Sequence, residues 1–281
     1  MSIIVRAVLT GMLITFVGSI PRSLLFLANL RVFPQFPWAV PVTGLYLWYF
    51  WRYLDGVGPP EDNAKDRKDS LRANPLLARV WVWSLVTGGL ALVALVLALR
   101  LANRFVALPA QTFPELGRVP ATTIVALLLI AAPAAGIIEE SAFRGYMQGP
   151  IERRFGLLPA ILITGTMFAV AHLDFTPILW PYYVAVAAIY GVITHVTGSI
   201  FPAIVLHTVG NLYSNFDLYL HGQAEWQAPA IQAASIWRTG PDASFWFSVA
   251  TLVAVAGLVA LAYSALRNVA NRQSQVLNDP L

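Results

Sequence analysis

Cysteine is absent from this 281-residue chain, and charged residues are scarce. Without cysteine the chain can form no disulfide, no thiolate metal site, no cysteine-ligated iron–sulfur cluster and no cysteine nucleophile, and it cannot be lipidated on cysteine. Asp, Glu, Lys and Arg make up only 11% of the residues, whereas soluble proteins contain about 25%. This deficit excludes an ordinary soluble globular protein.

Apolar residues dominate instead, at 58% of the chain with a mean hydropathy of +0.66. They gather in repeated runs close to the roughly 20 residues that a helix needs to cross a bilayer. The backbone in lipid must satisfy its own hydrogen bonds, and these runs lack the alternation of a membrane β-barrel. The sequence therefore predicts an all-α, polytopic membrane protein with about eight transmembrane helices, forming one membrane domain over residues 1–281.

The eight expected spans are 3–20, 37–54, 79–99, 119–146, 157–173, 178–195, 197–215 and 244–266. The first is interpreted as a retained helix, because residues 17–21 make a poor signal-peptide cleavage site. A polar, solvated loop with a short surface helix is expected at about 55–78, and a polar tail at about 267–281. The longest late loop, about 216–243, is expected to lie partly at the membrane interface; it holds Trp226, Pro229, Trp237 and Pro241.

The net charge of +4 fits positively charged cytoplasmic loops better than nucleic-acid binding, for which no motif is present. Of the 18 Lys and Arg residues, twelve fall on one side of the expected spans, and six, including Arg22 and Arg31, fall on the other. This bias predicts that both termini are cytoplasmic in a multi-pass integral membrane protein, located in the cell membrane if the source is prokaryotic. The lipid bilayer is the expected environment, and nucleic acid is not an expected partner.

A group of charges closes the fourth expected span. No residue from 119 to 138 is ionisable, and Glu139, Glu140 and Arg144 then follow within six positions. A charge at mid-bilayer costs roughly 2.5–3.5 kcal/mol on insertion scales, so such charges are usually functional. In a helix, Glu140 and Arg144 stand four residues apart and can pair, while Glu139 points about 100° away.

Two further pairs of residues share a helical face in the apolar segments. Phe168 and His172 end the fifth expected span, and His207 and Asn211 lie in the seventh. Singly, such residues more often join helices than perform chemistry; together with Glu139 they predict a buried polar site. A glutamate and a histidine can activate water, and a second histidine with an asparagine amide can stabilise an oxyanion.

The order of three motifs resembles a known family. The chain contains E-E-x-x-x-R at 139–144, F-x-x-x-H at 168–172 and H-x-x-x-N at 207–211. This pattern resembles the CAAX protease and bacteriocin-processing family of intramembrane endopeptidases, which includes the type II CAAX prenyl protease. The resemblance covers roughly residues 120–215. It implies a glutamate-dependent peptidase whose active site lies in a cavity within the membrane, with a catalytic core at about 119–215.

The resemblance also implies roles for individual residues. Glu139 would activate the attacking water with the help of His172, while His207 and Asn211 would form the oxyanion hole. Glu140 and Arg144 would position Glu139 and bind the C-terminal side of the substrate, with Phe168 in a supporting position. No cofactor is favoured, because asparagine is a poor zinc ligand and a good oxyanion donor. A zinc-dependent version held by Glu139, His172 and His207 stays open, although no H-E-x-x-H motif is present.

The expected substrate is a membrane-associated or lipidated peptide or protein, cleaved near its C terminus. One alternative is a non-catalytic immunity or scaffold protein that keeps the polar network for structure. Another is a proton-coupled transporter, but the chain shows no paired halves with broken helices. Residue counting raises one difficulty, since it places His172 toward the outer side and Glu139 at mid-helix. The two meet only if the fourth helix extends to about residue 146 and the fifth starts later or tilts.

Overall fold

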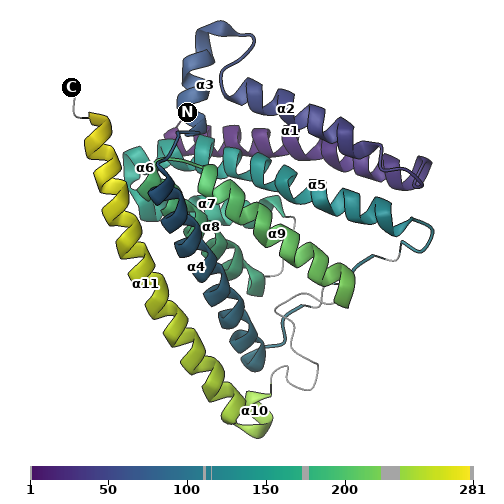
Figure 1. Ribbon diagram of the computed structural model, residues 1–281, viewed down its shortest axis with the longest axis vertical. Helices are drawn as coiled ribbons and strands as arrows, with labels where there is room; N and C mark the ends of the chain where they lie inside the picture. The colour runs from purple at the N-terminus through teal and green to yellow at the C-terminus, as the bar shows by residue number, and fades with distance from the viewer. Residues whose placement is uncertain (1, 110–111, 115, 173–176, 223–234, 279–281) are drawn as a thin grey trace.

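A computed structural model describes residues 2–109, 112–114, 116–172, 177–222 and 235–278. These residues form helices and connecting turns without any strand (Figure 1). The helices are α1 (Ile3–Val32), α2 (Ala39–Leu54), η1 (Glu61–Asn63), α3 (Ala64–Leu71), α4 (Ala78–Phe105), α5 (Ala121–Glu140), η2 (Ser141–Gln148), α6 (Gly149–Phe155), α7 (Leu157–Ala171), η3 (Pro177–Leu179), α8 (Trp180–Thr197), α9 (Phe201–His221), α10 (Ile236–Thr239) and α11 (Ala243–Asn278). The predicted all-α class is confirmed, and each expected span coincides with a helix.

Five helical segments among the described residues are long and apolar enough to cross a membrane: Ile3–Val32, Ala78–Phe105, Ala121–Phe155, Pro177–Thr197 and Ala243–Gln275. The other three expected spans are shorter or more polar. The α2 and α7 helices have 16 and 15 residues, which at 1.5 Å per residue reach only about 22–24 Å of a roughly 30 Å hydrocarbon core. The α9 helix carries the polar side chains of the candidate site.

The first helix is longer than expected, because Pro21 lies inside α1 and does not end it. The helix ends instead near Asn29, whose side-chain amide donates to the backbone oxygens of Phe33 at 3.1 Å and Phe36 at 3.0 Å. The Asn29 side-chain oxygen accepts from the backbone N–H of Ala39 at 2.9 Å. Arg22, which the charge count assigned to a loop, therefore lies within a membrane-spanning segment.

The fourth span also extends beyond its expected end at 146. The α5, η2 and α6 elements form one continuous helical segment from Ala121 to Phe155, with η2 wound as a π-helix. Gly156 turns the chain with φ of 87°, a conformation that favours glycine, and α7 runs back. Glu139 lies seventeen residues before Gly156 and His172 sixteen after it. The two antiparallel arms therefore carry Glu139 and His172 to the same depth, which resolves the difficulty raised by residue counting.

The late loop and the C-terminal tail are more helical than expected. The α9 helix continues to His221, and Trp237 lies in α10, where its indole N–H donates to the Phe105 backbone oxygen at 2.6 Å. Trp226 and Pro229 lie outside the described residues. Residues 267–278 continue α11 instead of forming a separate tail, and the Gln273 side chain accepts a hydrogen bond from the backbone N–H of Leu77 at 2.8 Å.

The polar loop at 55–78 contains the expected short helix, α3. However, Arg67 of α3 is buried rather than solvated. Its guanidinium donates to the backbone oxygens of Tyr53 at 2.9 Å, Pro60 at 2.8 Å and Gly58 at 2.7 Å. This arginine therefore holds the loop against the end of α2.

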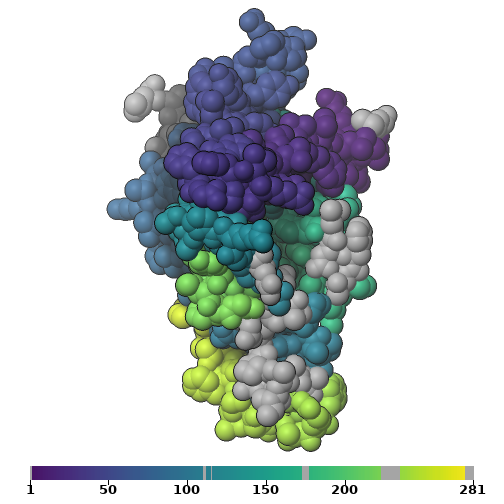
Figure 2. Space-filling model, turned by 90° about the vertical axis from the view of Figure 1, so that its right-hand side faces the viewer, coloured from purple at the N-terminus to yellow at the C-terminus, as the bar shows by residue number. Residues whose placement is uncertain are grey.

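The helices pack in adjacent layers. The α1, α2 and α5 helices lie side by side, and α4 lies along α11 (Figure 1). Turned by 90°, the molecule shows the α1–α2 region, α5, α9 and the α10–α11 region below one another (Figure 2). The α5 helix packs on α9 and α7 packs on α8. Glu139 therefore lies where α1, α5, α7 and α9 come together.

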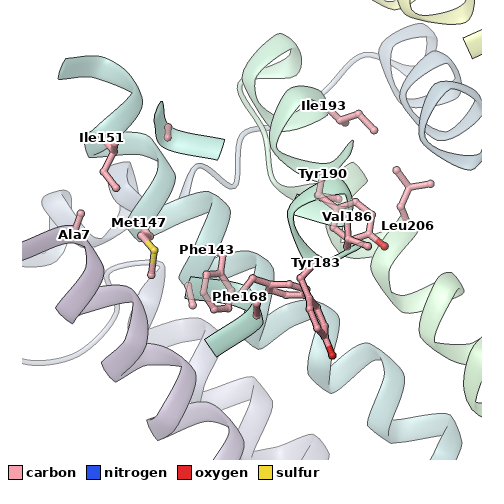
Figure 3. Packing of buried hydrophobic residues seen from close by; sticks show 14 of the residues in the cluster. Ala7, Phe143, Met147, Ile151, Phe168, Tyr183, Val186, Tyr190, Ile193 and Leu206 are labelled. Atoms are coloured by element: carbon pink, nitrogen blue, oxygen red, sulfur yellow. The ribbon is translucent and has the colours of Figure 1, made fainter. Parts of the chain in front are cut away.

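Small residues allow α1 to approach the helix that carries the glutamates. A Cβ added at Gly11 would lie 2.6 Å from Met147, and one added at Gly18 would lie 2.4 Å from Ile138. Figure 3 shows the adjoining apolar core, where Ala7 of α1 faces Met147 and Phe143 lies beside Phe168. This contact places α1 against the segment at 138–147.

Candidate active site

Glu140 and Arg144 form a fully buried ion pair. Arg144 Nε lies 3.2 Å from Glu140 Oε2, and neither side chain is exposed. The expected pair four residues apart is therefore formed, although Arg144 stands in the π-helical turn. The other oxygen of Glu140 lies 2.7 Å from Nδ1 of His207. Glu140 thus joins its own helix to α9 from a position without exposed surface.

Three aromatic rings surround the guanidinium of Arg144. Its central carbon lies 5.1 Å from the ring centre of Phe168, 5.2 Å from that of Tyr190 and 6.0 Å from that of Phe143. A cation over aromatic faces is attracted by their quadrupoles, more strongly when water is excluded. The two terminal nitrogens of Arg144 form no hydrogen bond with the described residues. Ring contacts and the Glu140 carboxylate therefore compensate this buried charge.

His207 lies between the two adjacent glutamates. Its Nδ1 lies 2.7 Å from Glu140 Oε1, and its Nε2 lies 3.8 Å from Glu139 Oε2. The imidazole also stacks on Tyr190, with ring centres 5.3 Å apart and planes inclined by 18°. Because Nδ1 donates to a carboxylate, Nε2 is the nitrogen that faces Glu139 and the cavity. Glu140 therefore fixes one edge of the His207 ring, and Tyr190 packs against one of its faces.

A hydrogen bond to its own helix occupies one ring nitrogen of His172 and leaves the other, Nε2, free. Nδ1 lies 2.8 Å from the backbone oxygen of Phe168. A carbonyl oxygen can only accept, so Nδ1 carries the proton and Nε2 is available as an acceptor. The ring also contacts Phe168 and Tyr183, with centre distances of 4.5 Å and 4.8 Å. These contacts orient the last residue of the α7 segment.

His172 lines two cavities. A smaller one of about 390 Å³ is lined by Glu139, His172 and residues of α1. A larger one of about 720 Å³ is lined by His172, His207 and Asn211, and it has apolar walls from α4, α8 and α9. The structure thus brings Glu139 to His207 and into one cavity with His172. Asn211 lines the larger cavity and not the one that holds Glu139.

A glycine that sequence reasoning missed permits the contact between α5 and α9. A Cβ at Gly136 would lie 2.6 Å from the hydroxyl oxygen of Thr208 and 3.0 Å from the backbone oxygen of Ile204. Residues three and four positions further along a helix share its face, so Gly136 lies on the side of Glu139 and Glu140. The only available signal was that it is the sole glycine in the apolar run before Glu139.

Arg22 is a second residue that sequence reasoning missed. It comes from α1 and lines the smaller cavity together with Glu139 and His172. The first span was expected to end at residue 20, so Arg22 was counted among the charges outside it. With the helix continuing to Val32, the arginine lies at membrane depth beside the candidate catalytic glutamate.

Among the described residues, no group of three or more His, Asp or Glu residues is arranged to hold a metal ion. Both candidate histidines direct Nδ1 to an acceptor of the fold, His207 to Glu140 and His172 to the Phe168 carbonyl. These contacts leave Nε2 of each ring for the site and suit either the metal-free or the zinc alternative. The remaining histidines bind carboxylates elsewhere, His195 to Glu152 and His221 to Asp217. The metal-free mechanism remains a prediction, and no step is assigned to a metal.

Part of the chain matches a known protein family. Residues 121–213 match the family model described as Type II CAAX prenyl endopeptidase Rce1-like. No curated protein and no solved structure shows significant similarity to the chain. The matched segment runs from the start of α5 into α9 and holds all three motifs. The resemblance to the CAAX proteases is therefore confirmed: residues 121–213 carry the sequence pattern of the type II CAAX prenyl endopeptidase Rce1-like family.

Proposed function

We propose that this protein is an intramembrane, glutamate-dependent endopeptidase. It hydrolyses a peptide bond near the C terminus of a membrane-associated or lipidated substrate. The observation that carries the proposal is that His172 lines two cavities, one with Glu139 and the other with His207 and Asn211. A water and a peptide carbonyl held beside His172 face a base and two oxyanion donors.

The chemistry assigns one role to each polar group. Glu139 accepts a proton from water, His172 Nε2 orients that water, and the water oxygen attacks the carbonyl carbon of the substrate. His207 Nε2–H and the Asn211 amide donate to the resulting oxyanion. His207 performs this role as the imidazolium, because Nδ1–H already donates to Glu140. The C–N bond then breaks as Glu139 returns its proton to the leaving nitrogen. The second proton of the attacking water passes from the new carboxylic acid to the amine, so that the products are a carboxylate and an ammonium group.

Glu140 and Arg144 act as positioning residues in this scheme. Both are completely buried, so they hold the site without touching the substrate. Glu140 fixes the His207 ring through Nδ1, and Arg144 neutralises Glu140 inside its ring of aromatic side chains. Phe168 supports both groups, because its ring contacts Arg144 and its carbonyl holds His172.

The larger cavity indicates the chemical class of the substrate. Its walls include Leu92, Leu95 and Val96 of α4 and Val186 of α8. Its volume of about 720 Å³ lies within the roughly 300–1,000 Å³ range of ligand pockets. An apolar or lipid-bearing chain can occupy this space next to the polar groups at its inner end. The fit supports a membrane-associated substrate over a soluble polar peptide.

The test uses purified protein in liposomes with membrane-anchored peptides that carry a fluorescent tag on their C-terminal side. Wild type should release the tag. Glu139→Gln should reduce the rate by about 10²–10⁴-fold, the usual contribution of a general base. His221→Gln is the matched control, since His221 is exposed and binds Asp217 away from the site. Full activity in Glu139→Gln would refute the mechanism, and chelator inhibition reversed by Zn²⁺ would support the zinc version.

A further inference from the structure

Arg22 is a charged side chain that lines the same cavity as Glu139 and His172. It lies inside the membrane-spanning segment Ile3–Val32. It forms no hydrogen bond and no ion pair within the part of the chain that the structure describes. Charges at this depth are costly and usually face a cavity or a partner that carries function. An arginine here therefore requires an anion or a route to water.

The smaller cavity supplies the position for such an anion. Arg22 lines this cavity together with Ser19 and Ser23 of α1, and with Glu139 and His172. Thr15, Ser19 and Arg22 follow the spacing of one helical face, so α1 presents a polar stripe to the cavity. Guanidinium and hydroxyl groups together donate hydrogen bonds in the manner that a carboxylate accepts.

The second arginine of the site cannot take this role. Arg144 is fully buried, its Nε faces Glu140 at 3.2 Å, and three rings enclose it. Arg22 and Glu139 line the same cavity, but the structure forms no ion pair between these two side chains. The smaller cavity therefore contains a cation that remains able to bind a ligand.

The two cavities define a direction for the substrate across His172. The larger, apolar cavity suits the membrane-anchored or lipidated part of the chain, which precedes the scissile bond. The smaller cavity of about 390 Å³ then receives the short segment that follows it. That segment ends in a carboxylate when cleavage is close to the C terminus, and arginine binds carboxylates through two parallel hydrogen bonds.

We propose that Arg22 is the residue that binds the C-terminal carboxylate of the substrate. This inference rests on the proposed peptidase function and makes it more specific. Arg22 is a specificity residue in this scheme, whereas Glu139 and His172 perform the chemistry.

The first experiment compares two anchored substrates that differ only in a C-terminal carboxylate or carboxamide. Wild type should cleave the carboxylate form with a kcat/KM about ten- to a hundredfold higher, the ratio expected for a charge-assisted hydrogen bond. Arg22→Gln should reduce this carboxylate-to-carboxamide ratio of kcat/KM to about one, because only the carboxylate form loses a charge-assisted hydrogen bond. Arg31→Gln, which removes an exposed charge at the end of the same helix, should keep the wild-type preference.

Equal loss on both substrates in Arg22→Gln would overturn the proposal and would make Arg22 a counter-ion of Glu139 or a structural residue. Arg22→Lys should retain part of the preference for the carboxylate, because it keeps the charge but loses the paired donors. A wild type that cleaves both forms equally would also contradict the proposal.

Binding of a short apolar peptide separates this inference from the proposed function. Wild type should bind the peptide acid about tenfold or more tightly than its amide, and Arg22→Gln should not distinguish them. If wild type cleaves neither anchored substrate but still prefers the acid in binding, the peptidase proposal fails and the Arg22 site stands. If wild type binds acid and amide equally, the Arg22 proposal fails whatever the cleavage result.

Discussion

Nδ1 of His207 lies 2.7 Å from Oε1 of Glu140, and Nε2 of the same ring lies 3.8 Å from Glu139. Adjacent residues on a helix point about 100° apart, so a single side chain can contact both only from a helix packed between their directions. The α9 helix occupies that position. The two glutamates therefore have different surroundings. Glu140 is buried in an ion pair with Arg144, whereas Glu139 borders a cavity.

This difference predicts that neutralising Glu140 lowers stability, whereas neutralising Glu139 lowers activity. Glu140→Gln removes the charge that compensates Arg144, and breaking a buried ion pair from one side typically destabilises by about 3–5 kcal/mol. Glu139→Gln removes a carboxylate that borders a cavity and should abolish cleavage without lowering the thermal unfolding temperature. Unfolding temperature and cleavage rate of both variants, measured in the same detergent, test the prediction. Similar unfolding temperatures for the two would contradict it.

The close contact between Gly136 and α9 predicts that a larger residue at this position lowers both stability and activity. An added Cβ would force α5 away from the Ile204 and Thr208 backbone, and overpacking typically destabilises by about 1–3 kcal/mol. Gly136→Ala should therefore lower both stability and activity, because it also moves Glu139 away from His207. Gly257→Ala is the matched control, since nothing lies within 4 Å of that position on α11. That control should be neutral or stabilising, by roughly 0.5–1 kcal/mol. Equal behaviour of the two variants would refute the role of Gly136.

The sequence predicted the helical class and the main polar residues because composition and spacing record them directly. A pair four residues apart, such as Glu140 and Arg144, can be predicted from the sequence whenever the segment is helical. The depth of His172 was also present in the sequence, in its nearly equal distance from Gly156 on the other arm. It was missed because the fourth helix was expected to end near 146, before the turn.

Other features depend on contacts between helices that no local pattern reports. The first span was expected to end at residue 20, yet α1 continues through Pro21 to Val32. That error removed Arg22 from the candidate site. The π-helical winding of η2 and the close approach at Gly136 likewise follow from tertiary packing, since neither residue type nor spacing distinguishes these positions in a single sequence.

The aromatic surroundings of Arg144 predict that lysine cannot replace it. A planar guanidinium spreads its charge over the rings of Phe168 and Tyr190, whereas an ammonium is a strongly hydrated point charge. Arg144→Lys should lower the unfolding temperature by an amount that reflects about 2 kcal/mol, the value for desolvated cation–π contacts. Arg154→Lys is the control, because Arg154 is exposed and lies over Phe155 alone. A loss in the control as large as in Arg144→Lys would argue against a special role for the buried rings.

Asp242 predicts a pH dependence of stability that is independent of the active site. Its carboxylate accepts hydrogen bonds from Arg104 at 3.0 Å, from Ser244 at 2.8 Å and from the backbone N–H of Phe245 at 2.8 Å, at the start of α11. Hydrogen bonding to Arg104, and then to Phe245 and Ser244, lowers the pKa of Asp242 from 3.8 to about 2.

A carboxyl whose pKa is lower in the folded state stabilises that state above its unfolded pKa, and this contribution disappears as pH falls through the folded pKa. The unfolding temperature of wild type should therefore exceed that of Asp242→Asn at pH 5, and the difference should shrink between pH 4 and pH 2. Asparagine can still cap the helix through its side-chain oxygen, so the variant isolates the charge, and a difference that stays constant over this range would show that the ion pair does not contribute to stability.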